Sequence, residues 1–195
     1  MSYLRNSCYL PYCIEVEEVH SNRYGKRGYK RAPRKEPTRE EIAEANERRR
    51  IKKLYRIIAT NFDFGDYHAV LTYRKDERPT PEQAKKILRT LLRNLRKAYQ
   101  KRGEPLHYII VTEYERASIH HHLIVNEIGD TIRIIKKLWP YGGTHFTPIY
   151  EAGEVKELAA YLIKETQKSF RKKDNPNKLA YSCSRNLKKP VVKTK

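Results

Sequence analysis

The 195-residue sequence has few cysteines and no long apolar run, and these absences exclude several classes of protein. Its cysteines, Cys8, Cys13 and Cys183, are odd in number and unpatterned, so we expect a reduced, cytoplasmic protein without a disulfide framework. No stretch approaches about eighteen consecutive apolar residues, so a transmembrane helix is not expected. The first residues lack the basic start and apolar centre of a secretion signal.

Acidic residues are scarce relative to basic ones. The chain has 42 Lys and Arg against 23 Asp and Glu, a formal net charge of +19. This excess is more than solubility requires, so a polyanionic partner is expected. Because basic residues occur in almost every segment, the charge suits an extended phosphate backbone better than one small acidic ligand. Fifteen tyrosines and four phenylalanines add ring faces on which bases can stack, although many of them must fill the core.

The chain divides into a basic N-terminal extension, residues 1–37, and a domain of residues 38–195. Residues 3–19 alternate enough for one or two irregular strands, and the basic stretch after them is rich in Gly and Pro, as in a flexible arm or loop. Such an arm can lie along a nucleic-acid backbone or remain solvated charge, and the sequence leaves both open.

Helix and strand signals in the domain follow a recognisable order. Thr38 and Glu41 form a capping-box pattern, and Thr80 followed by Pro81 marks a second helix start. We predict helices at 39–59, 81–101, 132–138 and 154–170, and strands at 67–73, 108–111, 122–125 and 145–150. From the first strand, the order β-α-β-β-α-β is that of a ferredoxin-like or RNA-recognition-motif-like sheet. The predicted fold is therefore α+β, with a central antiparallel sheet and helices on one face, which leaves the other face for a ligand.

Three consecutive histidines lie in the predicted hairpin at 107–129. Since strand side chains alternate between faces, His120 and His122 share one face and His121 points to the other. A chance histidine tract is the alternative interpretation. A half-buried strand favours apolar residues, however, so two histidines on one face indicate a function.

The register of the hairpin decides which carboxylate joins these histidines. If the turn is centred on Arg116 and Ala117, Glu113 lies opposite His120 on the same face, whereas a two-residue slip brings Glu115 there. Either arrangement predicts a mixed nitrogen and oxygen metal site.

A tyrosine and a lysine stand one turn apart on the last predicted helix. Tyr161 and Lys164 share a side of this helix, where ordinary packing would explain a tyrosine. Beside a metal site in a very basic protein, another explanation gains weight. A metal can polarise a phosphodiester while a tyrosine oxygen attacks it and a lysine stabilises the developing charge.

Taken together, the motifs resemble those of the HUH endonucleases, single-strand nucleases with a His-hydrophobic-His motif. They are most similar to the replication initiators of rolling-circle plasmids and small single-stranded DNA phages. The resemblance covers roughly residues 38–190 and rests on AVLTY at 69–73, VTEY at 111–114, HHHLIV at 120–125, YLIK at 161–164 and YSCSRNLKKP at 181–190. Two positions depart from the pattern. His121 replaces the hydrophobic residue, and Glu165 stands where some relatives carry a second tyrosine, so the resemblance implies a single-tyrosine mechanism.

The resemblance implies a specific activity. His120, His122 and Glu113 would hold one Mg²⁺ or Mn²⁺, Tyr161 would attack the scissile phosphate of single-stranded DNA, and Lys164 would help to neutralise it. The products would be a 5′-phosphotyrosine and a free 3′-hydroxyl, which can rejoin. This nicking and joining would start and end rolling-circle replication of a phage or plasmid. Backbone contacts are expected from the basic residues Arg48, Arg49, Arg50, Lys52, Lys53, Arg185, Lys188 and Lys189.

The same resemblance implies partners and a location. The substrate would be single-stranded DNA at a replication origin, in extended or hairpin form, in the cytoplasm of a bacterial host and away from any membrane. A Gly-rich loop ending in Lys-Ser or Lys-Thr is missing from the sequence, so a host helicase would unwind the DNA and a host polymerase would copy it.

Two alternatives remain open from the sequence. A single-tyrosine transposase or relaxase of the same superfamily would use the same chemistry. A binding module without catalysis would explain the net charge and the tyrosines, but it would leave His120 and His122 unexplained. Metal dependence and a covalent protein–DNA adduct distinguish a nuclease from such a module.

Overall fold

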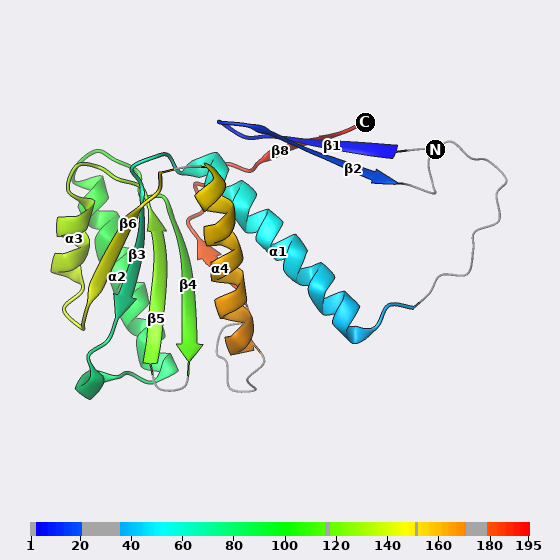
Figure 1. Ribbon diagram of the computed structural model, residues 1–195. Coiled ribbons are helices and arrows are strands. Elements are labelled where there is room, and N and C mark those ends of the chain that lie inside the picture. The colour runs from blue at the N-terminus through cyan, green and yellow to red at the C-terminus, as the bar shows by residue number, and fades with distance from the viewer. Residues whose placement is uncertain (1–2, 21–35, 116–117, 151, 171–178) are drawn as a thin grey trace.

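The computed structural model describes residues 3–20, 36–115, 118–150, 152–170 and 179–195 (Figure 1). Within them the helices are α1 (Arg39–Asn61), α2 (Pro81–Gln100), α3 (Thr131–Leu138) and α4 (Ala152–Phe170), with a short 3-10 helix at Lys75–Glu77. The strands are β1 (Tyr3–Tyr9), β2 (Ile14–His20), β3 (Tyr67–Thr72), β4 (Tyr108–Glu115), β5 (Ser118–Val125), β6 (Thr144–Pro148), β7 (Ser182–Cys183) and β8 (Val191–Thr194). No helix among these residues is long and apolar enough to cross a membrane. The basic stretch at 21–35 and the hairpin turn at 116–117 lie outside the described residues.

The first two helices begin at the predicted positions, and each start is a capping box. The Thr38 hydroxyl accepts a hydrogen bond from the Glu41 backbone N–H, and the Glu41 carboxylate accepts one from the Thr38 N–H. Thr80 and Gln83 repeat this arrangement at the start of α2, where Pro81 is the first helical residue. Each box satisfies backbone donors that a helix leaves unpaired, which contributes roughly 1 kcal/mol. Both predicted helix starts are confirmed.

The central sheet has five antiparallel strands in the order β6-β3-β5-β4-β7. The segment from β3 to β6 follows the predicted β-α-β-β-α-β order, and its four strands lie side by side in the order fourth, first, third, second. The predicted α+β class with a central antiparallel sheet is therefore confirmed.

Helices cover parts of both faces of this sheet, whereas the prediction placed them on one face only (Figure 1). Helices α2 and α3 pack on one face, with Leu91 and Leu95 of α2 against Leu123 of β5. On the opposite face, α4 packs against β4, with α1 beside it. The side chains buried there come from α1 (Leu54, Ile58), β4 (Ile109, Val111), β5 (Ile124) and α4 (Leu162, Ile163). Because β4 and β5 carry apolar residues on both faces of the sheet, helices must shield both faces from water.

A second antiparallel sheet joins the two ends of the chain, in the order β2-β1-β8 (Figure 1). The predicted irregular strands of residues 3–19 form a regular hairpin, and its first strand also pairs with β8. Two ion pairs hold the hairpin on α1, Arg56 Nε to Glu15 Oε2 at 2.6 Å and Lys52 Nζ to Glu17 Oε1 at 2.5 Å. The proposed domain boundary at residue 37 precedes α1 and stays a prediction.

Candidate active site

The hairpin of β4 and β5 has the first of the two predicted registers. Glu113 lies directly opposite His120, and Glu115 lies opposite Ser118. The two-residue slip is therefore not adopted, although the Glu115 side chain itself lies outside the described residues. His120, His122 and Glu113 thus share one face of the sheet, as the alternation of the strand predicted.

A buried cluster forms around His122 on this face. Its Nε2 atom lies 3.4 Å from Glu113 Oε2, and the two residues are only 2% and 5% exposed. Its Nδ1 atom lies 3.1 Å from Nε2 of His68 on β3, and the two rings stack with centroids 5.3 Å apart. The sequence analysis missed His68. The only signal was a polar residue in an apolar strand, and its partner depends on how β3 pairs with β5.

Burial keeps these two histidines uncharged near neutral pH. It lowers the pKa of His122 to about 4, helped by the charge of His120, although the nearby Glu165 carboxylate acts in the opposite direction. Burial likewise lowers the pKa of His68 to about 4, with His122 and His145 adding to the shift. An uncharged imidazole keeps a nitrogen lone pair, so both rings are in the form that a metal ligand or a hydrogen-bond acceptor requires.

Two imidazoles and a carboxylate on one face fit a divalent cation by donor chemistry. The ligand atoms of these three side chains do not converge on one point, however. Among the residues that the structure describes, no three His, Cys, Asp or Glu side chains are gathered closely enough to hold a metal ion. Rotamer changes of side chains that already share a face would be needed to complete such a site.

Helix α4 brings Tyr161 to this cluster. Leu162 and Ile163 are fully buried and hold the helix on the sheet, while Tyr161 is 46% exposed. Its ring meets the His122 ring edge to face, with centroids 5.5 Å apart and an interplanar angle of 78°. Lys164, one turn further on, is exposed on the same side of the helix. The fold therefore places a solvent-accessible phenol against a buried histidine 39 residues away in sequence.

His121 points to the opposite face and has a different environment. It is 1% exposed, its Nε2 atom lies 2.9 Å from the Tyr73 hydroxyl, and its Nδ1 atom lies 2.9 Å from Thr112 Oγ1. Trp139 packs edge to face against the ring. Burial, followed by the charges of His122 and His120, lowers the pKa of His121 to about 3. A polar residue is thus tolerated between the two site histidines because both of its nitrogens have hydroxyl partners.

The family comparison covers this whole arrangement. A family model for the replication-associated protein ORF2 matches residues 66–170, which is more than half of the chain. The chain belongs to this replication-associated protein family. The matched region runs from β3 to the end of α4 and includes the histidine hairpin and Tyr161. No curated protein and no solved structure matches the chain. Membership supports the predicted replication initiator over a transposase or a relaxase.

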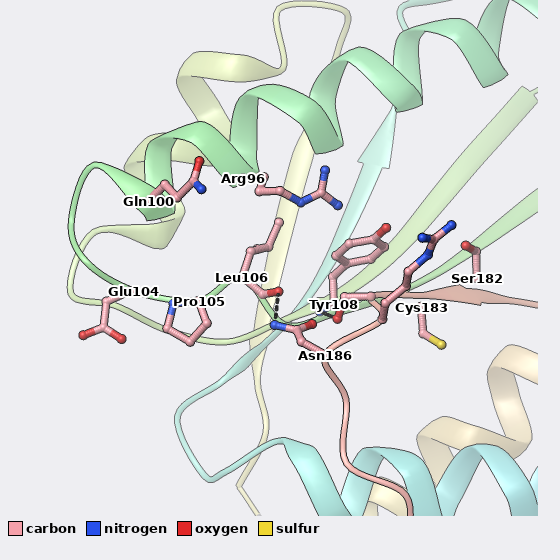
Figure 2. Close-up of a pocket in the computed structure, with 11 residues that line it drawn as sticks. Arg96, Gln100, Glu104, Pro105, Leu106, Tyr108, Ser182, Cys183 and Asn186 are labelled. Carbon is pink, nitrogen blue, oxygen red and sulfur yellow. Dashed lines mark hydrogen bonds between the residues drawn. The ribbon is translucent and has the colours of Figure 1, made fainter.

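The basic residues predicted to contact nucleic acid lie outside the region matched to the replication-associated family. On α1, Arg48, Arg49, Arg50 and Lys53 are exposed, while Lys52 is paired with Glu17. Arg185, Lys188 and Lys189 are exposed in the segment between β7 and β8. Of these residues, Arg185 lines a cleft of about 730 Å³ between α2 and this C-terminal segment (Figure 2).

Proposed function

We propose that this member of the replication-associated protein family is an HUH-type endonuclease that nicks and rejoins single-stranded DNA at a replication origin. The observation that carries the proposal is the placement of Tyr161 against His122, whose Nε2 atom faces Glu113 within the family region. A nucleophile, two imidazoles and a carboxylate are the groups that metal-assisted phosphodiester cleavage through a covalent intermediate requires. The net charge of +19 suits the polyanionic substrate.

His120, His122 and Glu113 would hold one Mg²⁺ or Mn²⁺. The chemistry that a bound cation supplies here is polarisation of the scissile phosphodiester. His68 acts as a positioning residue, because Nδ1–H of His122 can donate to its Nε2. That hydrogen bond would fix the tautomer of His122 and leave the lone pair of its Nε2 atom for the cation, on the side where Glu113 lies.

Tyr161 would act as the nucleophile. Its oxygen loses a proton and forms a bond to phosphorus, while the bond from phosphorus to the 3′ oxygen breaks and that oxygen takes up a proton. The products are a 5′-phosphotyrosine and a free 3′-hydroxyl. Lys164, on the same side of α4, would neutralise part of the phosphate charge. The covalent bond retains the phosphodiester energy, so the 3′-hydroxyl can reverse the step without ATP.

The biological setting follows from this chemistry. Nicking would start rolling-circle replication of a phage or plasmid in the cytoplasm of a bacterial host, and rejoining would end it. A host polymerase would extend the free 3′-hydroxyl, and a host helicase would unwind the DNA, since the sequence carries no Gly-rich loop ending in Lys-Ser or Lys-Thr.

A covalent adduct tests the proposal directly. Labelled single-stranded oligonucleotides from the element's own origin are incubated with Mn²⁺ or Mg²⁺ and resolved on a denaturing gel. We expect a protein–DNA adduct with the wild type and none with Tyr161→Phe, whereas Tyr150→Phe, a change at another exposed tyrosine, retains it. An adduct that survives in Tyr161→Phe moves the nucleophile elsewhere. Tight binding without any adduct favours a binding module.

A matched pair of variants tests which carboxylate is the metal ligand. Glu113→Gln keeps the shape of the side chain but removes its charge, and we expect at least about 100-fold less adduct because a metal ligand is lost. Glu115→Gln, two residues further along β4, is the control and retains most of the activity. The reverse order would assign the ligand to Glu115.

A further inference from the structure

A stripe of cations runs along the solvent side of α2. Lys85, Arg89, Arg93 and Arg96 recur at intervals of four, four and three residues, so they lie on one side of the helix. All four are exposed, and none makes an ion pair with another described residue. From first to last they span about 16 Å of helix axis. The stripe therefore presents an uncompensated line of positive charge.

This stripe ends at the cleft between α2 and the C-terminal segment. Arg96 is the last residue of the stripe and also lines the cleft, where Figure 2 shows its side chain extending toward the ring of Tyr108. Tyr108 and Leu106, both almost fully buried, form an apolar floor. Arg185 adds a second guanidinium from the C-terminal side. The cleft combines two guanidinium groups with an aromatic and aliphatic surface, and one carboxylate, Glu104, also lines it.

Hydrogen bonds fix the C-terminal wall of the cleft. The Ser184 hydroxyl accepts from the Tyr108 N–H at 3.1 Å, and the Ser184 N–H donates to the Tyr108 carbonyl at 2.9 Å. Asn186 Nδ2 donates to the Leu106 carbonyl at 3.2 Å. Arg185 therefore stands between two residues that are attached to the start of β4 and the loop before it. The backbone that carries Arg185 is therefore anchored on both sides, so less of its freedom is lost when the side chain binds an anion.

We propose that the α2 stripe and this cleft form a second DNA-binding surface. Phosphates of one DNA strand lie along the stripe, and one nucleotide enters the cleft with its phosphate at Arg96 and Arg185 and its base against Tyr108 and Leu106. Arginine pairs well with phosphate oxygens, and an aromatic ring accepts any base by stacking. The inference rests on the proposed function only in taking DNA as the ligand.

This surface is separate from the reacting phosphodiester. Tyr108 belongs to the face of the sheet that α2 covers, whereas Glu113 and His122 belong to the opposite face. Along β4, Tyr108 and Glu113 are also about 17 Å apart. The strand held at the cleft is therefore DNA that flanks the nicked nucleotides, and it anchors the protein beside the site of cleavage.

A charge-matched pair of variants tests the stripe. Binding of a long, fluorescently labelled single-stranded oligonucleotide is measured by anisotropy without divalent metal, so no cleavage is required. Arg89→Gln/Arg93→Gln/Arg96→Gln removes three stripe charges. Lys101→Gln/Lys136→Gln/Lys137→Gln removes three exposed charges at and beside a groove between the end of α2 and α3, away from the stripe. Circular dichroism checks that both variants fold.

The two variants should differ clearly. We expect the stripe variant to bind at least about 10-fold more weakly, with a plot of log K against log salt that is shallower by about 2 for three lost phosphate contacts. The groove variant should stay within about 2-fold of the wild type, since its cations are placed away from the strand. Equal losses in the two variants would overturn the proposal, because only total charge would then matter.

Cys183 reports on the cleft itself. This thiol is exposed and lines the cleft, while the exposed Cys13 lies in the turn between β1 and β2 and Cys8 is buried. We expect the oligonucleotide to slow maleimide labelling of Cys183 at least several-fold and to leave Cys13 unchanged, as followed by mass spectrometry. Equal labelling of Cys183 with and without DNA would overturn the cleft assignment. So would equal protection by free deoxynucleotides, since the cleft would then bind a nucleotide rather than a strand.

The result is independent of the proposed chemistry. Both measurements are made without metal, so an absent covalent adduct would reject the nuclease and leave the binding surface standing. Conversely, the adduct could form while the stripe variant binds DNA no more weakly than the control variant and DNA leaves Cys183 labelling unchanged. That result would reject the binding surface and keep the nuclease.

Discussion

His121 and His122 are neighbours on β5 and both are almost fully buried, but they lie in two different regions of the molecule. His121 faces α2 and α3, where the Tyr73 and Thr112 hydroxyls satisfy both ring nitrogens and Trp139 packs on the ring. His122 faces α4, between the Glu113 carboxylate, a second imidazole and the exposed Tyr161. Burial alone therefore does not mark a functional histidine. The chemistry of the atoms around it does.

The largest expected effect is that substitution of His122 lowers metal affinity and activity, whereas substitution of His121 lowers stability. His122→Ala should lower Mn²⁺ affinity and adduct formation by at least about 100-fold, because it removes a proposed ligand. His121→Ala should instead cost about 2–4 kcal/mol in the free energy of unfolding, since it leaves a cavity and two hydroxyls without their partner. Isothermal titration calorimetry and urea denaturation measure the two quantities. Equal loss of metal affinity in both variants would contradict the contrast.

Acid should weaken both regions together. Burial lowers the pKa of His68 and His122 to about 4 and that of His121 to about 3, below the ordinary value of about 6.5. As the pH falls below about 6.5, the unfolded chain binds protons that the folded protein does not. Stability is therefore full above that pH and is lost as the pH falls toward 4, at about 1.4 kcal/mol for each unit of pKa difference.

Urea denaturation of the metal-free protein at pH 7.5 and pH 5 measures this loss. His121→Phe should show a smaller loss than the wild type, while a change at the exposed His20, His20→Gln, should leave the loss unchanged. Stability that does not fall over this range would show that these histidines become protonated without unfolding.

A smaller effect is expected at the positioning residue. His68→Ala should weaken Mn²⁺ binding about 10- to 100-fold, because His122 loses the partner that orients its ring. His68→Gln should restore part of the affinity, since an amide oxygen can also accept from Nδ1–H of His122. Thr147→Ala changes the residue paired with His68 on β6 and serves as the control. Unchanged affinity in His68→Ala would remove His68 from the site.

The smallest effect is expected on the other face. Thr112→Val keeps the shape of the side chain but removes the hydroxyl beside His121 Nδ1, which should cost about 1–2 kcal/mol in the free energy of unfolding. Adduct formation should not change, because Thr112 points away from Glu113 and His122. Thr147→Val, at an exposed position of β6, should change the unfolding free energy by much less.

Several features were predictable because their signals are local. The capping boxes at Thr38 and Thr80 each span four residues, and helices begin there as predicted. The pairing of Glu113 with His120 follows from the length of a single hairpin, so only two registers had to be weighed. The prediction of helices on one face was wrong in that α1 and α4 cover the opposite face, because the apolar residues of α4 do not indicate which side of the sheet they will cover.

Local sequence was enough to predict which residues share a face: His120, His122 and Glu113 on the hairpin, and Tyr161 with Lys164 on α4. Backbone geometry sets these relations within one element or one turn. Three contacts depend on how distant elements pack: His68 stacks on His122, Tyr161 meets the same ring, and the C-terminal segment forms a cleft with α2. Those contacts join elements that are far apart in the chain. The burial of apolar surface places them, and no local pattern encodes which surfaces will meet.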